Sequence, residues 1–466
     1  MKRELFLKIL KAGVAAFMLY LLLFADHLRR SSFGVIGSAL RELTAILLDP
    51  GTQWMALLCL GIYFTAFLFF RGHGSPGFCR AANPDLWLAC GMVLMAALYA
   101  IHHVPSAPAL TLLAGAVLGQ GTAFWADLEN QNPKFRIQNR FGVLAVSILV
   151  IFLACASVWH PSVGHAYEYR SQARWSSLWD NPNIFGLLMA TGVMLALGLT
   201  VAAFLMLSGK IWKWLCALLC LFAAILMGRG LLHSYSRGAW VGTVCGLAYL
   251  AVDGFNGSRL VQVTVREAYI SWFKKRRNPL SVVSLSVVLL SMVVFAFWHF
   301  RETDLLPIRR ALSSVNAADF SWRNRIAAWE GALQITAENP FLGTAWGQPE
   351  PMYEHYYLPP KLTERGAFEL NDYLMLGATL GIPALFCFGM YLWLSLTQEW
   401  ESRKQKAEIQ DVGWLRTVCH AGAIVLLIGF WFDGGLFKLP TAATFWILLE
   451  LGNARHHETN DALNHE

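Results

Sequence analysis

The sequence predicts an all-α polytopic membrane protein with about twelve transmembrane helices and one large loop on the outer side. Of its 466 residues, 56% are hydrophobic and 14% are charged, whereas soluble domains carry roughly 25% charged residues. Many apolar runs reach the length that a membrane-spanning helix needs, which outer-membrane barrel strands do not have. The net charge of +7 is spread over short loops, so a nucleic-acid binder is not expected.

Twelve stretches are apolar enough to cross about 30 Å of hydrocarbon as helices. They are residues 8–25, 53–70, 85–102, 107–125, 141–160, 184–207, 211–230, 239–253, 281–299, 370–397, 415–432 and 438–452. The stretch 33–49 carries Arg41 and Glu42 in its middle. That pattern favours an interfacial amphipathic helix over a further span.

The distribution of Lys and Arg places both termini in the cytoplasm. The N-terminus is basic, and each loop that would then be cytoplasmic is basic too, namely 71–84, 126–140, 208–213, 254–280 and 398–414. The first span is predicted to be an uncleaved anchor rather than a signal peptide, because no A-x-A site precedes Asp26.

Three segments fall on the outer side, and the large one divides the chain. Residues 300–369 separate transmembrane helices 1–9 in residues 1–299 from helices 10–12 and a cytoplasmic tail in residues 370–466. The two shorter outer segments are 161–183 and 229–238.

The large loop has a helical pattern of its own. Ile326, Trp329, Leu333 and Thr336 recur at helical spacing, which predicts an amphipathic helix over 324–338. Pro340 is expected to end this helix.

The sequence predicts neither a disulfide nor a metal site nor a cofactor. Of nine cysteines, none lies in a predicted outer loop, and Cys216 and Cys220 have no further ligand near them. Phosphate-binding glycine loops, the H-E-x-x-H pair and the G-x-S-x-G elbow are missing from the sequence.

Arginines on the outer side are the strongest functional signal, since the positive-inside rule disfavours them there. Arg237 lies between two apolar stretches and is flanked by Ser236 and Gly238. A guanidinium group matches phosphate oxygens with a fork of donors, and glycine permits a close approach. The alternative is an arginine that snorkels from the end of a span.

Further arginines lie in the other two outer segments. Arg174 precedes an Asn181-Pro182-Asn183 turn that offers Asn as a helix N-cap, and Arg323 and Arg325 precede the predicted loop helix. Each alone could be an ordinary loop charge, but together they could bind a lipid diphosphate. The aromatic stretch 346–357, which contains His355, suits stacking on sugars and equally suits an interfacial belt.

These elements, in this order, resemble the O-antigen ligase and O-antigen polymerase superfamily of bacterial membrane glycosyltransferases. Ser236-Arg237-Gly238 is similar to the family's S-R-G-A element, and Arg174 with Asn181 and Asn183 is similar to its R…N-P-N loop. Arg325 and Trp329, followed by Gly343 and Gly347, resemble the family's R-x-x-x-W element and the glycine-rich element after it. Asn371 and Gly381 resemble its H-N-x-Y-L…G element.

The resemblance implies a GT-C-like helical fold and a metal-independent transfer at the periplasmic face of the bacterial inner membrane. The donor would be a glycan on undecaprenyl diphosphate, and the acceptor a hydroxyl of a glycan, a lipid A-core or a protein, within polysaccharide or lipopolysaccharide biosynthesis. The arginines would bind the diphosphate and stabilise the leaving group.

The sequence departs from the family at two positions. The family's motif His is Leu370 here, and Ala345 replaces the middle glycine of its glycine-rich element. Glu369 and His355 are the candidates for an acid–base role. The alternative is a protein of the same fold that binds or transports lipid-linked glycans without catalysis.

Overall fold

The computed structural model describes residues 84–102, 111–123 except 113, 114 and 117, 140–158, 168–169, 172–179, 181–206, 209–257, 320–345, 347–359, 371–405 and 413–453. Three predicted spans (8–25, 53–70 and 281–299), the predicted interfacial helix at 33–49 and the candidate base Glu369 lie outside these residues.

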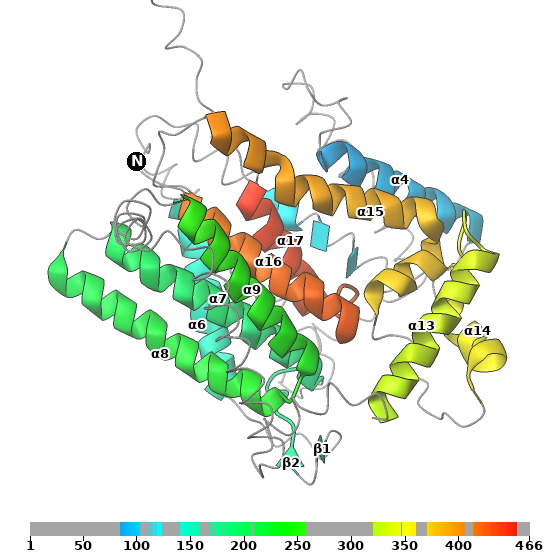
Figure 1. Cartoon of the computed structure of the whole chain (residues 1–466), viewed down its shortest axis with the longest axis horizontal. Helices are drawn as coiled ribbons and strands as arrows, with labels where there is room; N and C mark the ends of the chain where they lie inside the picture. The colour runs from blue at the N-terminus through cyan, green and yellow to red at the C-terminus, as the bar shows by residue number, and fades with distance from the viewer. Residues whose placement is uncertain are drawn as a thin grey trace, which may run out of the picture.

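The described part of the chain is almost entirely helical (Figure 1). Its elements are α4 (Pro84–His102), α6 (Arg140–Val158), β1 (Glu168–Tyr169), β2 (Gln172–Ala173), α7 (Pro182–Met206), α8 (Lys210–Ser234), α9 (Arg237–Gly257), α13 (Phe320–Glu338), α14 (Pro349–Met352), the π-helix η3 (Tyr353–Tyr357), α15 (Asp372–Gln405), α16 (Gly413–Phe432) and α17 (Leu439–Asn453). The two strands pair antiparallel over two residues each.

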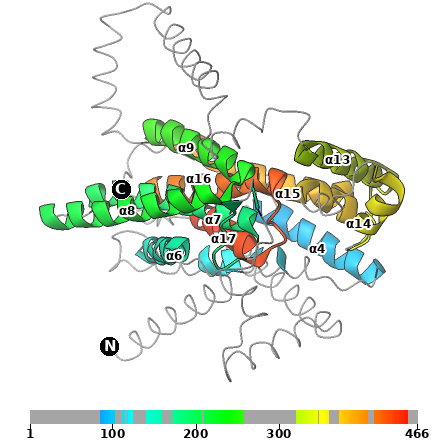
Figure 2. The same cartoon turned by 90° about the horizontal axis from the view of Figure 1, so that it is seen from below.

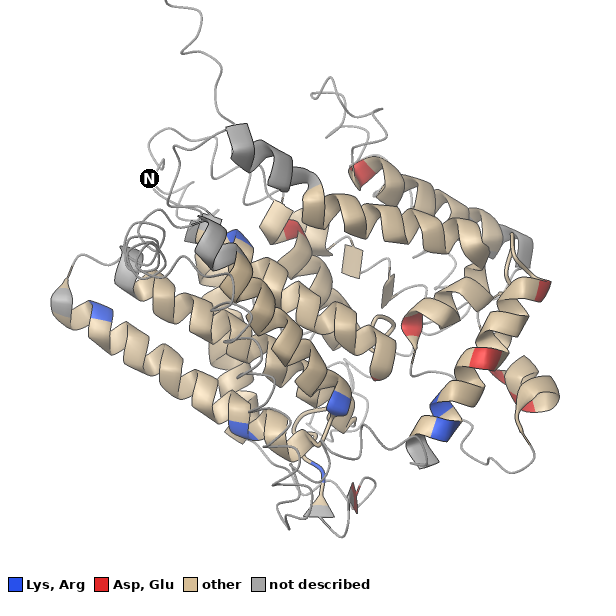
Figure 3. Ribbon diagram, in the orientation of Figure 1, with Lys and Arg blue, Asp and Glu red and all other residues tan. Residues whose placement is uncertain are grey.

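Four described helices are long and apolar enough to cross a membrane, namely Pro182–Ala203, Ile211–Ser234, Asp372–Thr397 and Trp414–Phe432. Shorter apolar helices run through Pro84–Met95, Gly142–Val158 and Arg237–Val252. Figure 3 shows long uncharged stretches along these helices. An all-helical membrane fold is therefore confirmed for the described residues, while the count of twelve spans stays a prediction.

Helix α7 forms the centre of the bundle. Of the residues in its most apolar stretch, 78% are buried. It contacts α6, α8, α9, α16 and α17 (Figures 1 and 2). Helix α8 lies at the edge of the bundle, and only 28% of the residues in its most apolar stretch are buried. Leu218, Phe222 and Ile225 of α8 are exposed, as expected for side chains that face lipid.

The predicted helix in the large loop is confirmed, but its buried face is not the predicted one. Helix α13 ends at Glu338, ahead of Pro340. Its buried positions include Ala328, Ala332 and Ile335, whereas Ile326 and Leu333 are exposed. Alanine side chains let η3 and α15 approach α13 closely, a geometric preference that apolar periodicity does not report.

Helix α15 is broken in its first half by Gly381, whose φ is 81°. Two residues later Pro383 has no N–H to donate within the helix. The amide of Ile382 donates instead to the carbonyl of Pro340, which follows α13, at 2.8 Å. Three consecutive positions thus leave the ordinary helical pattern.

The segment after α13 supplies the hydrogen bonds that this break removes. The amides of Thr344 and Ala345 donate to the carbonyls of Ala378 and Thr379, at 3.0 and 3.1 Å. Irregular backbone at the membrane is tolerated where protein groups satisfy it. A Cβ on Gly343 would strike the Thr379 carbonyl. This clamp between the loop 340–345 and the break 378–383 fixes α13 against α15.

Candidate functional site

Arg237 occupies the first turn of α9 rather than a loop. Helix α8 extends to Ser234, and Tyr235 turns the chain with a φ of 50°. Ser236 then caps α9, because its hydroxyl oxygen accepts the Ala239 amide at 3.2 Å. The Arg237 residue is 6% exposed. A buried arginine at this position is unlike a snorkelling side chain, which keeps its guanidinium group in water.

Asp433, directly after α16, lies against this turn. Its carboxylate accepts a short hydrogen bond from the Ser236 hydroxyl. A Cβ on Gly238 would collide with the same carboxylate, which explains why the residue after Arg237 has no side chain. The carboxylate also benefits from the positive end of the α9 dipole.

Arg325 reaches the same carboxylate from α13. Its Nη2 lies 3.2 Å from Asp433 Oδ1, and the two side chains are 8% and 2% exposed. The Arg237 guanidinium carbon lies 6.0 Å from the centre of the Trp322 ring, one turn before Arg325 on α13. Two of the predicted arginines, 88 residues apart in sequence, are thus brought to one place.

Buried donors without an acceptor lie on α13 and at the start of α15. Arg325 Nε, Trp329 Nε1 and Asn371 Nδ2 are buried and have no hydrogen-bond partner among the described residues. Buried polar atoms of this kind are rare and call for an explanation. Several open N–H groups beside two guanidinium groups form a setting that suits an anion.

The start of α15 is joined to the loop that follows Asp433. Asn371 caps α15 by accepting the Leu374 amide at 3.0 Å, and the Asp372 carboxylate accepts the Leu436 amide at 2.7 Å. The Asn371 element of the motif pattern therefore lies close to the end of α16. Leu370, where the family has His, lies outside the described residues.

Arg174 lies on the other side of the 234–236 turn. Its Nε donates to the Ser234 carbonyl at 2.8 Å, and its Nη2 donates to Asn183 Oδ1 at 2.6 Å. Asn181 caps α7, since its side-chain oxygen accepts the Asn183 amide. Through Arg174, the R…N-P-N element therefore connects the end of α8 to the start of α7, next to the turn that precedes Arg237.

The remaining predicted residues have other surroundings. Arg323 is exposed on α13. His355 is exposed in η3 with its ring 4.5 Å from that of Tyr356, and among the described residues no contact joins it to the arginine cluster. Beside it, burial raises the pKa of the Tyr353 hydroxyl, and a hydrogen bond to Glu338 raises the pKa of Tyr357.

The motif glycines allow backbone conformations with positive φ. Gly343 and Gly381 belong to the clamp between the loop and α15, and Gly347 has a φ of 77° with open space around it. Ala345, at the position where the family has glycine, has a φ of 75° and is buried. This conformation disfavours alanine.

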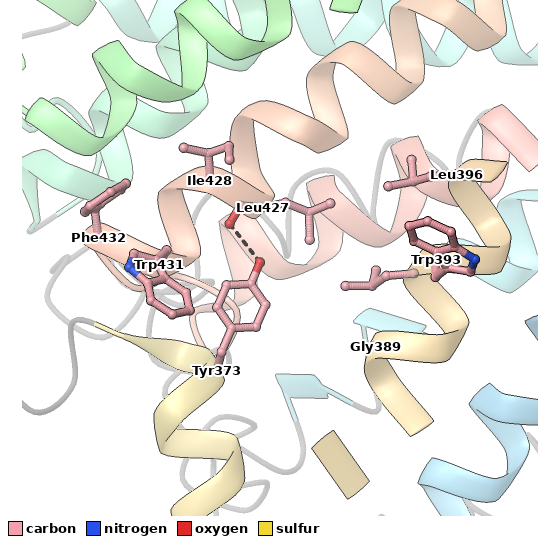
Figure 4. A pocket seen from close by; sticks show the side chains of 9 residues that line it. Tyr373, Gly389, Trp393, Leu396, Leu427, Ile428, Trp431 and Phe432 are labelled. Carbon is pink, nitrogen blue, oxygen red and sulfur yellow. Dashed lines mark hydrogen bonds between the residues drawn. The ribbon is translucent and has the colours of Figure 1, made fainter. Parts of the chain in front are cut away.

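An apolar groove of about 540 Å³ begins beside Asp433, between α15 and α16 (Figure 4). Its lining consists of Tyr373, Gly389, Leu392, Trp393, Leu396, Leu427, Ile428, Trp431 and Phe432. Tyr373 spans the groove and donates to the Leu427 carbonyl at 2.7 Å (Figure 4). Trp431 and Phe432 contact the rings of Trp329 and Trp322 on α13, so aromatic side chains connect the groove to the arginine cluster.

Comparison with known proteins agrees with the pattern of these residues. Residues 222–389 match the O-Antigen ligase family model. The match confirms the resemblance to the O-antigen ligase-like superfamily, and it covers Ser236, Arg237, Arg325, Asn371 and Gly381. No curated protein matches the chain.

Asp433 lies beyond the O-antigen ligase match, and sequence reasoning missed it. The available signal was an acidic residue directly after an apolar span, followed by Gly434 and Gly435. Among the described residues, no group of three His, Cys, Asp or Glu side chains could hold a metal ion.

Proposed function

We propose that this chain transfers a glycan from undecaprenyl diphosphate to an acceptor hydroxyl at the periplasmic face of the inner membrane. The family match supports ligase- or polymerase-type glycosyl transfer in general. The observation that supports a diphosphate donor is the proximity of two buried arginines: Arg325 pairs with Asp433, and the Arg237 guanidinium carbon lies 6.0 Å from the ring of Trp322, one turn before Arg325 on α13. Two buried guanidinium groups in one place suit a diphosphate, because each has a fork of donors that matches phosphate oxygens.

In this proposal the diphosphate binds between α9 and α13. Arg237 and Arg325 contact its oxygens, and the open N–H groups of Arg325, Trp329 and Asn371 contribute further donors. Asp433 holds Arg325 in place and fixes Ser236 at the start of α9. Arg174 acts through the turn that it braces.

The polyprenyl chain of the donor then lies in the groove between α15 and α16. The groove is almost wholly apolar, and it starts at Trp431 and Phe432, immediately before Asp433. A ligand with a charged head and a long hydrocarbon tail fits an arginine cluster that is followed by an apolar groove. The proposed donor has both parts.

The reaction forms two bonds and breaks two. The acceptor oxygen bonds to the anomeric carbon while the bond from that carbon to the diphosphate oxygen breaks, and the acceptor O–H proton passes to a base or to the departing diphosphate. Guanidinium groups stabilise the charge that develops on the departing diphosphate. In a desolvated site such stabilisation is several times stronger than in water.

The proton of the acceptor hydroxyl has three possible destinations in this proposal. Asp433 already accepts hydrogen bonds from Ser236 and Arg325, so both of its carboxylate oxygens are engaged. Glu369, next to Leu370, remains the first candidate, and His355 the second. Departure of the diphosphate without a dedicated protein base is the third possibility.

The rival function is binding or transport of a lipid-linked glycan without transfer. One observation favours it, namely the leucine at position 370 where the family has His. Both functions require the donor to bind at Arg237 and Arg325, so the experiment must separate binding from release.

The test uses the purified full chain in lipid nanodiscs with a glycan linked to undecaprenyl diphosphate and a panel of acceptors. Transfer predicts release of undecaprenyl diphosphate together with a larger glycan product. Arg237→Ala should abolish release, and Arg237→Lys should impair donor binding, because an ammonium group lacks the bidentate fork. Binding without release across the panel would favour the rival, and unchanged donor affinity in Arg237→Ala would refute the diphosphate site.

A further inference from the structure

A second basic site lies near the C-terminal end of α8 and consists of side chains that are not part of the arginine cluster. The ring of Trp175 stacks on His233, with 4.1 Å between centroids and an interplanar angle of 18°. The Arg229 guanidinium carbon lies 5.2 Å from the centre of the same indole ring. Arg229 and His233 are one helical turn apart, so both point to the same side of α8.

The backbone holds this arrangement in place. The Trp175 amide donates to the His233 carbonyl at 3.1 Å. The neighbouring Arg174 side chain donates to the Ser234 carbonyl and holds the same segment against the end of α8. The His233 Nδ1 lies 2.9 Å from the Arg229 carbonyl, where its N–H donates. The indole is therefore a fixed platform for the arginine.

The guanidinium of Arg229 keeps its hydrogen-bonding capacity. Arg229 is exposed, and its guanidinium group contacts the aromatic ring of Trp175, which accepts no conventional N–H hydrogen bond. Among the described residues no carboxylate pairs with it. Its five N–H donors therefore point to the surroundings of α8.

Those surroundings are the outer leaflet in the predicted orientation. Arg229 lies five residues before the end of α8, about 7.5 Å along the axis at 1.5 Å per residue. Leu232 beyond it and Ile225 before it are exposed on this lipid-facing helix. An arginine at this depth reaches the level of the lipid phosphates.

We propose that Trp175, Arg229 and His233 form a binding site for the phosphate group of an anionic lipid in the outer leaflet. The phosphate accepts the guanidinium fork of Arg229, while Trp175 fixes the orientation of that fork and His233 supports the indole. The phosphate could come from a bilayer phospholipid or from a phosphorylated glycolipid that serves as acceptor. The site does not depend on the transfer reaction, because Arg237 is buried on α9 and takes no part in it.

Native mass spectrometry of the delipidated full chain tests this site. The probes are a phosphatidylglycerol, a glucosamine disaccharide lipid with two phosphates, and a phosphatidylcholine as the zwitterionic reference. Arg229→Gln keeps much of the side-chain length and removes the charge. Lys213→Gln removes a charge from the opposite end of the same helix and is the matched control. Arg229→Lys retains the charge without the fork.

Arg229→Gln is expected to weaken binding of the anionic probes about tenfold, which is the value of one charge-assisted contact. Lys213→Gln should stay within about twofold of the parent, and Arg229→Lys should fall between the two. An Arg229-dependent preference of tenfold or more for the phosphorylated glycolipid would assign the site to an acceptor. Equal affinity for both anionic probes would assign it to bilayer lipid. Arg229→Gln with parental affinity for both would overturn the proposal.

Discussion

Removing the Asp433 carboxylate should destabilise the protein strongly, because it leaves a buried guanidinium group without its counterion. The Arg325 and Asp433 side chains are 8% and 2% exposed. Breaking one partner of such a pair typically costs about 3–5 kcal/mol. Asp433→Ala also removes the acceptor of the Ser236 hydroxyl at the cap of α9. We therefore expect a loss in the upper half of that range.

The reciprocal change, Arg325→Met, keeps the length of the side chain and removes the charge. Asp433 then retains only its hydrogen bond to Ser236, so a loss of about 3 kcal/mol is expected. In the double variant neither charge is left unpaired. The double variant should thus be more stable than the sum of the two losses predicts, by about 2 kcal/mol.

Unfolding of the full chain in mixed micelles, titrated with a denaturing detergent, gives the four free energies of this cycle. Arg323→Gln is the matched control, since Arg323 is exposed two residues away on the same helix, and a change within about 0.5 kcal/mol is expected. Losses that add within about 0.5 kcal/mol would refute the coupling of Arg325 with Asp433 and with it the assembly of the site described above.

Three further substitutions test the clamp and the brace around the site. Ala345→Gly should raise the free energy of unfolding by about 0.5–1 kcal/mol, because Ala345 has a φ of 75° that glycine adopts freely; a lower melting temperature would contradict this. Gly381→Ala should lower it by about 3 kcal/mol or more, since the added Cβ would lie 2.6 Å from the Phe341 carbonyl oxygen at a positive φ. Parental detergent resistance of that variant would argue against the clamp. Arg174→Ala should cost about 1–3 kcal/mol by removing donors from two acceptors, yet weaken donor binding less than Arg237→Ala does. An equal loss of donor affinity in a binding titration would place Arg174 on the diphosphate itself.

Much of the helical framework could be predicted because it depends on local properties of the chain. The apolar stretch 184–207 is long enough to cross a membrane, and it forms α7, Pro182–Met206. Pro340 prevents α13 from continuing, and α13 indeed ends at Glu338. The Asn181 cap of α7 follows from the same kind of short-range chemistry.

The buried face of α13 could not be predicted in this way. The apolar spacing of Ile326 and Leu333 suggested a buried face, yet alanines on another side of α13 are buried. Helix α13 packs against η3 and α15, whose own shape decides which side chains fit. Periodicity in one helix contains no information about the partner.

The sequence by itself determined that the protein is a helical membrane protein, that arginines lie in its predicted outer segments, and that its motifs resemble the O-antigen ligase family. Only the tertiary structure brought Arg325 to Asp433, 108 residues along the chain. It also showed that Arg174 connects the end of α8 to the start of α7. It also provided the groove that begins at Trp431 and ends near Leu396. The physical reason is that helices and caps form from neighbouring residues, whereas a charge site and a groove arise where the packing of distant helices brings side chains together.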